Sequence, residues 1–100
     1  MLRCPVVSVI VRQTGAGNPI ELDVEVREGR GHTRHRVSLE PALLAKLGHG
    51  ASAEAFVAAA FAFLLEREPK ESILTRFDVS VIARYFPEFD SEIGRYLKAK

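Results

Sequence analysis

The chain has 100 residues, a formal net charge of +1, 47% apolar residues and 27% charged residues. This length suits one α+β domain over residues 1–100, and the composition excludes disordered and fibrous classes. The near-zero net charge provides no overall field for nucleic acid or an anionic membrane, so any such partner would need a local patch.

Cys4 is the only cysteine, so the chain cannot form an internal disulfide or a multi-cysteine zinc site. A lone cysteine favours a reducing compartment, and we expect a cytoplasmic protein without a cofactor. The longest unbroken apolar run, residues 55–65, is too short to span a membrane. Residues 6–11 are β-branched and lack a cleavage site, which indicates a strand and not a signal peptide.

Two strands are expected before residue 28. Residues 6–11 are apolar at nearly every position, which predicts a strand that is central or covered on both faces. Residues 14–19 are rich in glycine, asparagine and proline and predict a loop. Apolar and charged residues then alternate over 20–27, which predicts a strand with one buried face.

A hairpin turn at Gly29-Arg30 fixes the register of the second strand against a third that ends at Leu39. A slip of one residue would bury the charged side chains, so this register is strongly specified. Opposite charges then meet on one face and apolar groups on the other. The predicted pairs are Glu25–Arg34 and Asp23–Arg36 outside, with Val24–His35, Leu22–Val37 and Ile20–Leu39 inside.

The remaining residues predict helices. A short helix covers residues 41–47, and Ser52 caps the main helix, which Pro69 ends. Asp78 can cap a further helix, which Pro87 should end or kink. The expected fold class is therefore α+β, with a three-stranded antiparallel sheet followed by three to four helices.

The main helix is apolar on all sides over residues 55–65, so most of its surface must be covered. Either it is the central helix of the domain, or a second chain covers one side. Because one sheet and a few short helices provide limited cover, we expect a homodimer or another protein partner. The candidate interface residues are Phe56, Ala59, Ala60 and Phe63.

Basic residues concentrate around the predicted hairpin tip. On one strand face they would form a contact surface for phosphate or nucleic acid. The alternative is cross-strand pairing with Asp23 and Glu25, which would leave little net potential for a ligand. No aromatic residues are interleaved for base stacking. The candidate contact residues are Arg30, His32, Arg34 and Arg36.

Residues 80–97 resemble a helix-turn-helix sequence in the spacing of Ile82, Phe86 and Ile93. Pro87 stands where that motif usually has a glycine, and acidic residues open the second helix, where they would repel phosphates. The alternative is two amphipathic helices packed on the core.

No catalytic constellation stands out, and we expect a protein that is not an enzyme. His32 and His35 would lie on opposite faces of a strand, so they cannot share a metal ion. Residues 15–17 follow a strand as a dinucleotide loop would, but another strand and not a helix comes next. We therefore name no catalytic or metal-binding residue.

The segments 63–74, 77–82 and 85–88 resemble a recurring pattern in short bacterial proteins of unknown function. The resemblance covers about a quarter of the chain and implies a bacterial, cytoplasmic origin but no activity. The charged residues 66–71 could present a surface to a partner, or pair with one another in a linker. The sequence predicts a dimeric protein-interaction or accessory module, with nucleic-acid binding as the alternative.

Overall fold

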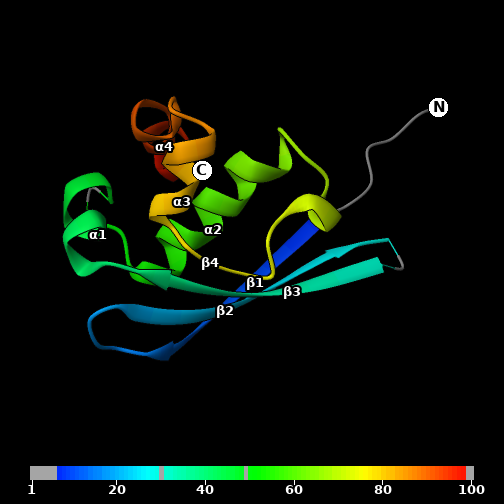
Figure 1. Ribbon diagram of the computed structural model, residues 1–100, viewed down its shortest axis with the longest axis horizontal. Coiled ribbons are helices and arrows are strands. Elements are labelled where there is room, and N and C mark those ends of the chain that lie inside the picture. The colour runs from blue at the N-terminus through cyan, green and yellow to red at the C-terminus, as the bar shows by residue number, and fades with distance from the viewer. Residues whose placement is uncertain (1–6, 30, 49, 99–100) are drawn as a thin grey trace.

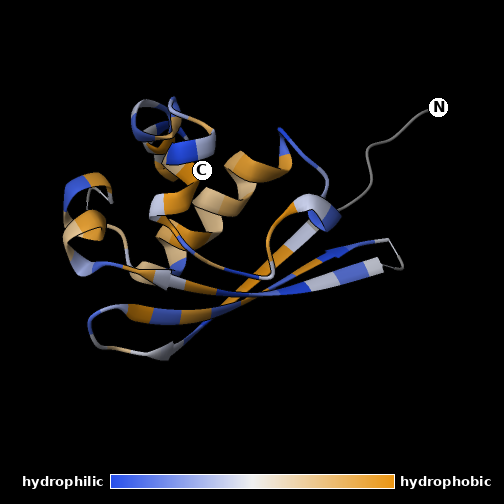
Figure 2. Cartoon of the chain, in the orientation of Figure 1, coloured by the Kyte–Doolittle hydropathy of each residue, from blue (hydrophilic) through white to orange (hydrophobic). Residues whose placement is uncertain are grey.

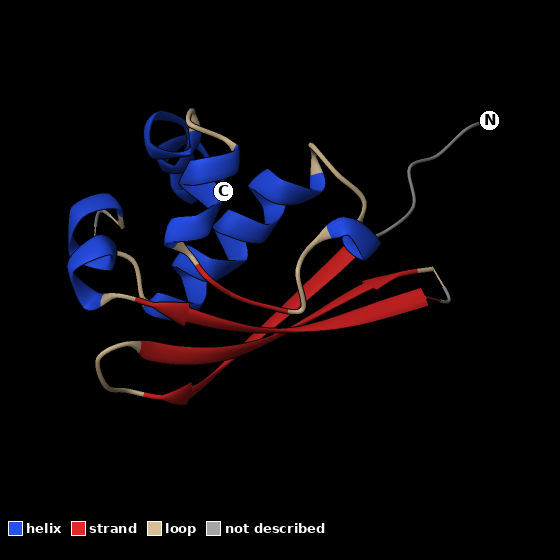
Figure 3. Ribbon diagram, in the orientation of Figure 1, coloured by secondary structure: helices blue, strands red, loops and turns tan. Residues whose placement is uncertain are grey.

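The computed structural model describes residues 7–29, 31–48 and 50–98. One sheet carries helices on one face and leaves the other face open (Figure 1, Figure 3). The elements, in chain order, are β1 (Val7–Gly15), β2 (Ile20–Glu28), β3 (Gly31–Leu39), α1 (Pro41–Leu47), α2 (Ala53–Leu65), the 3₁₀ turn η1 (Lys70–Ser72), β4 (Arg76–Asp78), α3 (Ser80–Tyr85) and α4 (Phe89–Lys98).

The sheet has four strands in the order β1-β2-β3-β4, so the predicted α+β class is confirmed but one strand was missed. The first three strands are antiparallel, as predicted, and β4 runs parallel to β3. The Arg36 amide donates to the Thr75 carbonyl at 2.7 Å, and the Val79 amide donates to the Ser38 carbonyl at 2.9 Å. With only three residues, β4 is too short to show an alternating pattern.

The predicted β2–β3 register is confirmed along the whole hairpin. Gly29 has a φ of 61°, the left-handed conformation that the turn requires at this position. Arg30, the other predicted turn residue, lies outside the described residues. The observed pairs include Glu25 with Arg34, Asp23 with Arg36, Val24 with His35, Leu22 with Val37 and Ile20 with Leu39.

The prediction for the first strand was wrong in two respects. β1 continues to Gly15, into residues expected to form a loop, and it lies at an edge of the sheet instead of its centre. Val9 and Val11 pack half-buried against the core, whereas Ile10 points to the open face and is 48% exposed. An apolar pattern on both faces does not distinguish a central strand from an edge strand with an exposed apolar residue.

Helix α2 is the centre of the core, which lies between the helices and the sheet (Figure 2). The Ser52 side chain accepts a hydrogen bond from the Ala55 amide at 3.1 Å, so the predicted cap is confirmed. On the sheet side, Phe61 lies against His35 and Phe77. On the opposite side, Phe63 makes edge-to-face contacts with Phe86, Phe89 and Tyr96.

The candidate interface on α2 is covered by the chain itself. Phe56, Ala60 and Phe63 are 0% exposed and Ala59 is 8% exposed, so these four side chains offer no surface to a partner. Helix α4 covers this side of α2, which the sequence pattern of α2 alone does not reveal. Any dimer has to use other residues.

The predicted cap is found in part: the residue directly before α3 is Val79, but the Asp78 carboxylate accepts a hydrogen bond from the Ser80 amide at 3.0 Å, at the start of the helix. Pro87 separates α3 from α4, which also agrees with the prediction. Among residues 7–29, 31–48 and 50–98, no helix combines the length and apolarity that crossing a membrane requires.

Candidate functional site

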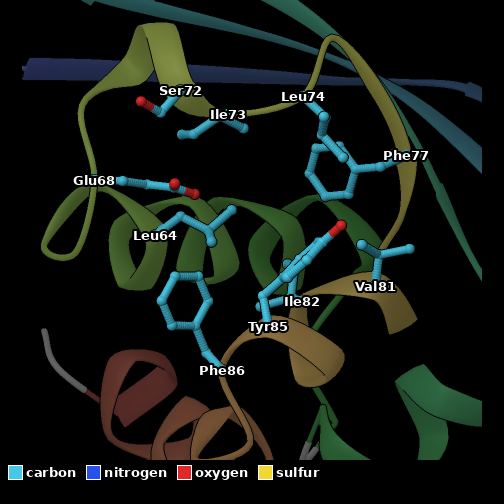
Figure 4. A pocket seen from close by; sticks show the side chains of 10 residues that line it. All are labelled: Leu64, Glu68, Ser72, Ile73, Leu74, Phe77, Val81, Ile82, Tyr85 and Phe86. Atoms are coloured by element: carbon cyan, nitrogen blue, oxygen red, sulfur yellow. The ribbon is translucent and has the colours of Figure 1, made fainter.

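The most distinctive hollow on the helical side is an apolar groove of about 380 Å³ between the η1–β4 segment and α3. Its floor is formed by Leu64, Ile73 and Ile82, all nearly fully buried. Figure 4 shows the walls, which come from segments far apart in the chain. The lining residues are Leu64, Glu68, Ser72, Ile73, Leu74, Phe77, Val81, Ile82, Tyr85 and Phe86.

Two large apolar side chains at the rim of the groove are left in solvent. Leu74 is 50% exposed on one wall, and Tyr85 is 70% exposed on the other. Ile10 is the third exposed large apolar side chain within the described residues, and it lies on the other side of the sheet. Exposed aliphatic and aromatic groups around an apolar hollow are typical of surfaces that bind other proteins.

The groove has one polar end, formed by Glu68 and Ser72. The Glu68 side chain is half-buried and extends toward the hollow (Figure 4). Within the part of the chain that the structure describes, no ion pair involves Glu68. A carboxylate in this setting favours a cationic group on whatever occupies the groove.

Neighbouring contacts fix the walls of the groove. The Nδ1 atom of His35 lies 2.7 Å from the Leu74 carbonyl oxygen, which holds the segment before β4 against β3. The Ser38 hydroxyl donates to Asp78 at 2.6 Å, and the same carboxylate holds the start of α3. Burial alone raises the pKa of Asp78, but the hydrogen bonds from Ser38 and Ser80 outweigh it and hold the pKa below its ordinary value.

The candidate nucleic-acid residues of β3 lie on the open face of the sheet. His32, Arg34 and Arg36 are exposed there, as predicted, and Arg30 lies outside the described residues. Arg36 pairs with Asp23 at 3.3 Å, as the register implies. Glu25 instead pairs with Arg27 on its own strand at 2.9 Å, so the expected Glu25–Arg34 ion pair is not formed.

The structure adds two arginines to this face. Arg12 on β1, Asp23 on β2, Arg36 on β3 and Arg76 on β4 occupy neighbouring positions in one row across the sheet. The row thus holds three arginines and one carboxylate, that of Asp23, which pairs with Arg36. Glu25 is paired with Arg27, whose hydrogen bond lowers the Glu25 pKa. Sequence reasoning missed Arg76 because it missed β4.

The other candidates contribute less. His35 is buried at the sheet–helix interface, in agreement with the predicted inward-facing Val24–His35 pair, whereas Cys4 lies outside the described residues. Among the side chains that are described, no cluster of His, Cys, Asp and Glu residues could hold a metal ion. In the helix-turn-helix-like segment, Phe89 and Ile93 of α4 are buried, which agrees with the core-packing alternative.

The charged segment 66–71 makes local contacts. Arg67 pairs with Glu88 at 3.1 Å and lies over the Phe63 ring. Lys70, although nearly buried, pairs with Glu71 at 2.7 Å and with Glu28 at 3.6 Å. These contacts fasten the end of α2 to α4 and η1 to the hairpin, so Arg67, Lys70 and Glu71 fit the linker interpretation. Glu68 of the same segment instead lines the groove.

Comparisons of the chain with protein-family models, with curated proteins and with solved structures found no match. The resemblance of residues 63–88 to short bacterial proteins therefore remains a hypothesis. The geometry of the groove and of the open sheet face is what bears on function.

Proposed function

We propose that this protein is a non-enzymatic protein-interaction module, from a bacterial cytoplasm, whose groove binds a peptide segment of a partner protein. The observation that carries the proposal is the exposure of Leu74 and Tyr85 on facing walls of one apolar hollow. A partner that covers these two side chains removes apolar surface from water, which favours association.

The groove also constrains the chemistry of the peptide. A volume of about 380 Å³ accommodates a few apolar side chains, and the exposed Leu74 and Tyr85 on its rim are accessible to a bound segment. The half-buried Glu68 at one end complements a lysine or arginine. We therefore expect a segment with two leucine- or phenylalanine-type residues next to a basic residue, in the manner of a helix lying in a groove.

A peptide array tests this proposal. Each member carries two leucines or two phenylalanines at helical spacing, flanked by either lysines or glutamates, and labelled protein is applied. The wild type should retain the lysine-flanked members. Leu74→Lys should weaken retention about tenfold or more, because it places a charge in the apolar wall. The charge-reversed Glu68→Lys should prefer the glutamate-flanked members.

Ile10→Lys is the matched control, because Ile10 is about as exposed as Leu74 and lies outside the groove. At protein concentrations low enough that the chain is monomeric, it should leave peptide retention unchanged. Retention that is the same for wild type and Leu74→Lys would refute the proposal, as would binding of a fatty acid or another small apolar ligand with no peptide retained. Thermal unfolding of each variant verifies that it is folded.

Nucleic-acid binding is the second candidate, supported by the row of Arg12, Arg36 and Arg76 on the open sheet face. These groups would contact phosphates and not bases, so affinity should fall steeply with salt. Polarisation of a labelled oligonucleotide across a salt series is the measurement. Arg76→Gln should reduce the salt slope by about one, whereas Arg95→Gln on α4 should not change it. Absence of binding at low salt would exclude this candidate.

A further inference from the structure

Within the described residues, the edge of β1 that faces away from β2 is another surface without a partner strand. β1 pairs with β2 on one side and is the outermost strand on the other. An edge strand presents a row of backbone N–H and C=O groups that can template pairing with another strand. At nine residues, β1 is long for a strand in this position.

The direction of these backbone groups follows from one contact. The Gln13 amide donates to the Glu54 carboxylate of α2 at 3.0 Å, so it points away from β2. Amides alternate in direction along a strand, so those of Val9 and Val11 also point outward. In the described part of the chain, no hydrogen bond from another element reaches the amide or carbonyl of Val9 or Val11.

Over residues 7–11, this edge also lacks the usual protection against pairing. Natural edge strands carry prolines, charges or bulges that prevent association. Residues 7–11 read Val-Ser-Val-Ile-Val and contain none of these, and the only irregularity in the β1–β2 pairing falls between Gln13 and Gly15. The outward-facing Ile10 is 48% exposed beside this edge.

Helix α2 provides a second apolar strip on the same side of the molecule. It packs on β1, and Glu54 in its first turn reaches the edge amide of Gln13. Ala58, Ala62 and Leu65 follow Glu54 by four, eight and eleven residues, so they lie on the same side of the helix, and all three are half-buried. Alanines at these positions would let another helix approach closely.

We propose that a second copy of this chain covers the edge, with β1 pairing antiparallel to the β1 of its copy about a two-fold axis at Ile10. Val9 then lies opposite Val11 of the copy, and each such pair exchanges two N–H···O bonds. The two Ile10 side chains meet in a non-hydrogen-bonded pair, with Cα atoms about 4.5 Å apart. The pairing ends at Gln13, whose amide is already bound to Glu54.

The sequence of β1 suits its own copy. Around the axis Val9 meets Val11 and Ile10 meets Ile10, so the apolar residues at the centre of the segment find apolar partners. Further out, Ser8 lies opposite Arg12 and Val7 lies opposite Gln13 of the copy. The two α2 helices come to lie side by side on one face, where Ala58, Ala62 and Leu65 of each copy lose their exposure. A two-fold interface of this kind closes on itself, so the product is a dimer and not a fibre.

The dimer has a consequence for the proposed function. β1 and β4 are opposite edges of the sheet, and the groove lies on the β4 side. Self-association therefore leaves both grooves open, at the two ends of a continuous eight-stranded sheet (four strands from each copy). A partner with two suitable segments would gain from binding both at once.

Sedimentation equilibrium from micromolar to millimolar concentration tests the dimer. The wild type should show one monomer–dimer equilibrium. Ile10→Lys should shift its dissociation constant upward by tenfold or more, because two lysines would face each other across the axis. Leu74→Lys is the matched control and should leave the monomer–dimer equilibrium unchanged. Loss of dimerisation and loss of peptide binding are therefore seen in different variants.

A disulfide tests the register independently. In a Cys4→Ser background, Ile10→Cys should form a covalent dimer on mild oxidation, since a separation of about 4.5 Å permits the bond. Leu74→Cys in the same background should remain monomeric on a denaturing gel. A monomer at all concentrations would overturn the proposal. So would open-ended assemblies, a dimer that Ile10→Lys leaves intact, or equal cross-linking of the two cysteine variants.

Discussion

His35 and Leu74 are 39 residues apart in the chain, yet the His35 Nδ1 atom lies 2.7 Å from the Leu74 carbonyl oxygen. A carbonyl oxygen only accepts hydrogen bonds, so Nδ1 must carry the proton. In the neutral imidazole, Nε2 then accepts from the Thr33 hydroxyl, 2.8 Å away. One buried side chain on β3 thus sets the position of a wall of the groove.

Replacing His35 should both destabilise the fold and weaken peptide retention. His35→Ala removes two hydrogen bonds and the contact with the Phe61 ring, and we expect a loss of about 2 kcal/mol in the free energy of unfolding. Thr33→Ala removes only the bond to Nε2 and should cost about 1 kcal/mol. Urea unfolding is the measurement, and equal losses in the two variants would contradict this assignment of roles.

The hairpin was predictable because a period-two pattern and the cross-strand charges admit one register only. Glu25 is opposite Arg34 and Asp23 is opposite Arg36, as counting from the turn requires. Which charges form ion pairs was less predictable, because Arg27 reaches Glu25 along its own strand and competes with Arg34. Residue spacing determines which charged side chains are neighbours across the strands, whereas their rotamers determine which of these neighbours form ion pairs.

The groove and the β1 edge were not predictable from local patterns. The floor of the groove combines Leu64, Ile73 and Ile82 from three segments, and β4 contributes its wall although it has only three residues. Similarly, the sequence of β1 shows that the strand is apolar but not which strands flank it. Both features depend on the order of strands in space, which is a property of the whole chain.

Asp78 should make stability depend on acid pH. A carboxyl group whose pKa is lower in the folded state contributes stability that is present above its unfolded-state pKa and is lost as the pH falls through the folded-state pKa. The relevant range lies below about pH 4. The difference in stability between wild type and Asp78→Asn should be constant at higher pH and shrink in this range.

Thermal unfolding of both proteins between acid and neutral pH provides this comparison. Glu25, Glu71 and Glu88 also have lowered pKa values, but they are present in both proteins and cancel in the difference. Asp90→Asn, at an exposed position in the first turn of α4, is the control. A difference between wild type and Asp78→Asn that does not change with pH would show that Asp78 is not held in its charged form.

Tyr96 joins α4 to the end of α2. Its hydroxyl donates to Glu66 at 2.6 Å and accepts from Arg67 at 3.4 Å, and the Arg67 guanidinium stacks 3.6 Å above the Phe63 ring. Tyr96→Phe keeps the ring contact with Phe63 and removes both hydrogen bonds. We expect it to cost about 1 kcal/mol in chemical unfolding. Arg67→Met should lower the free energy of unfolding less in the Tyr96→Phe background than in the wild type. Equal losses in the two backgrounds would show that the two residues are not coupled.

Phe63 can be tested for whether it is buried within one chain or between two chains. Phe63→Ala removes a fully buried ring that contacts Phe86, Phe89 and Tyr96, so we expect a loss of about 3–5 kcal/mol in the free energy of unfolding. Ala62→Ser, one position earlier on the outward side of α2, should cost about 0.5 kcal/mol or less in the monomer. Because the chain covers Phe63 by itself, the Phe63→Ala loss should be the same at low and high protein concentration. A loss of stability seen only at high protein concentration, where copies associate, would show instead that Phe63 lies in an interface between chains.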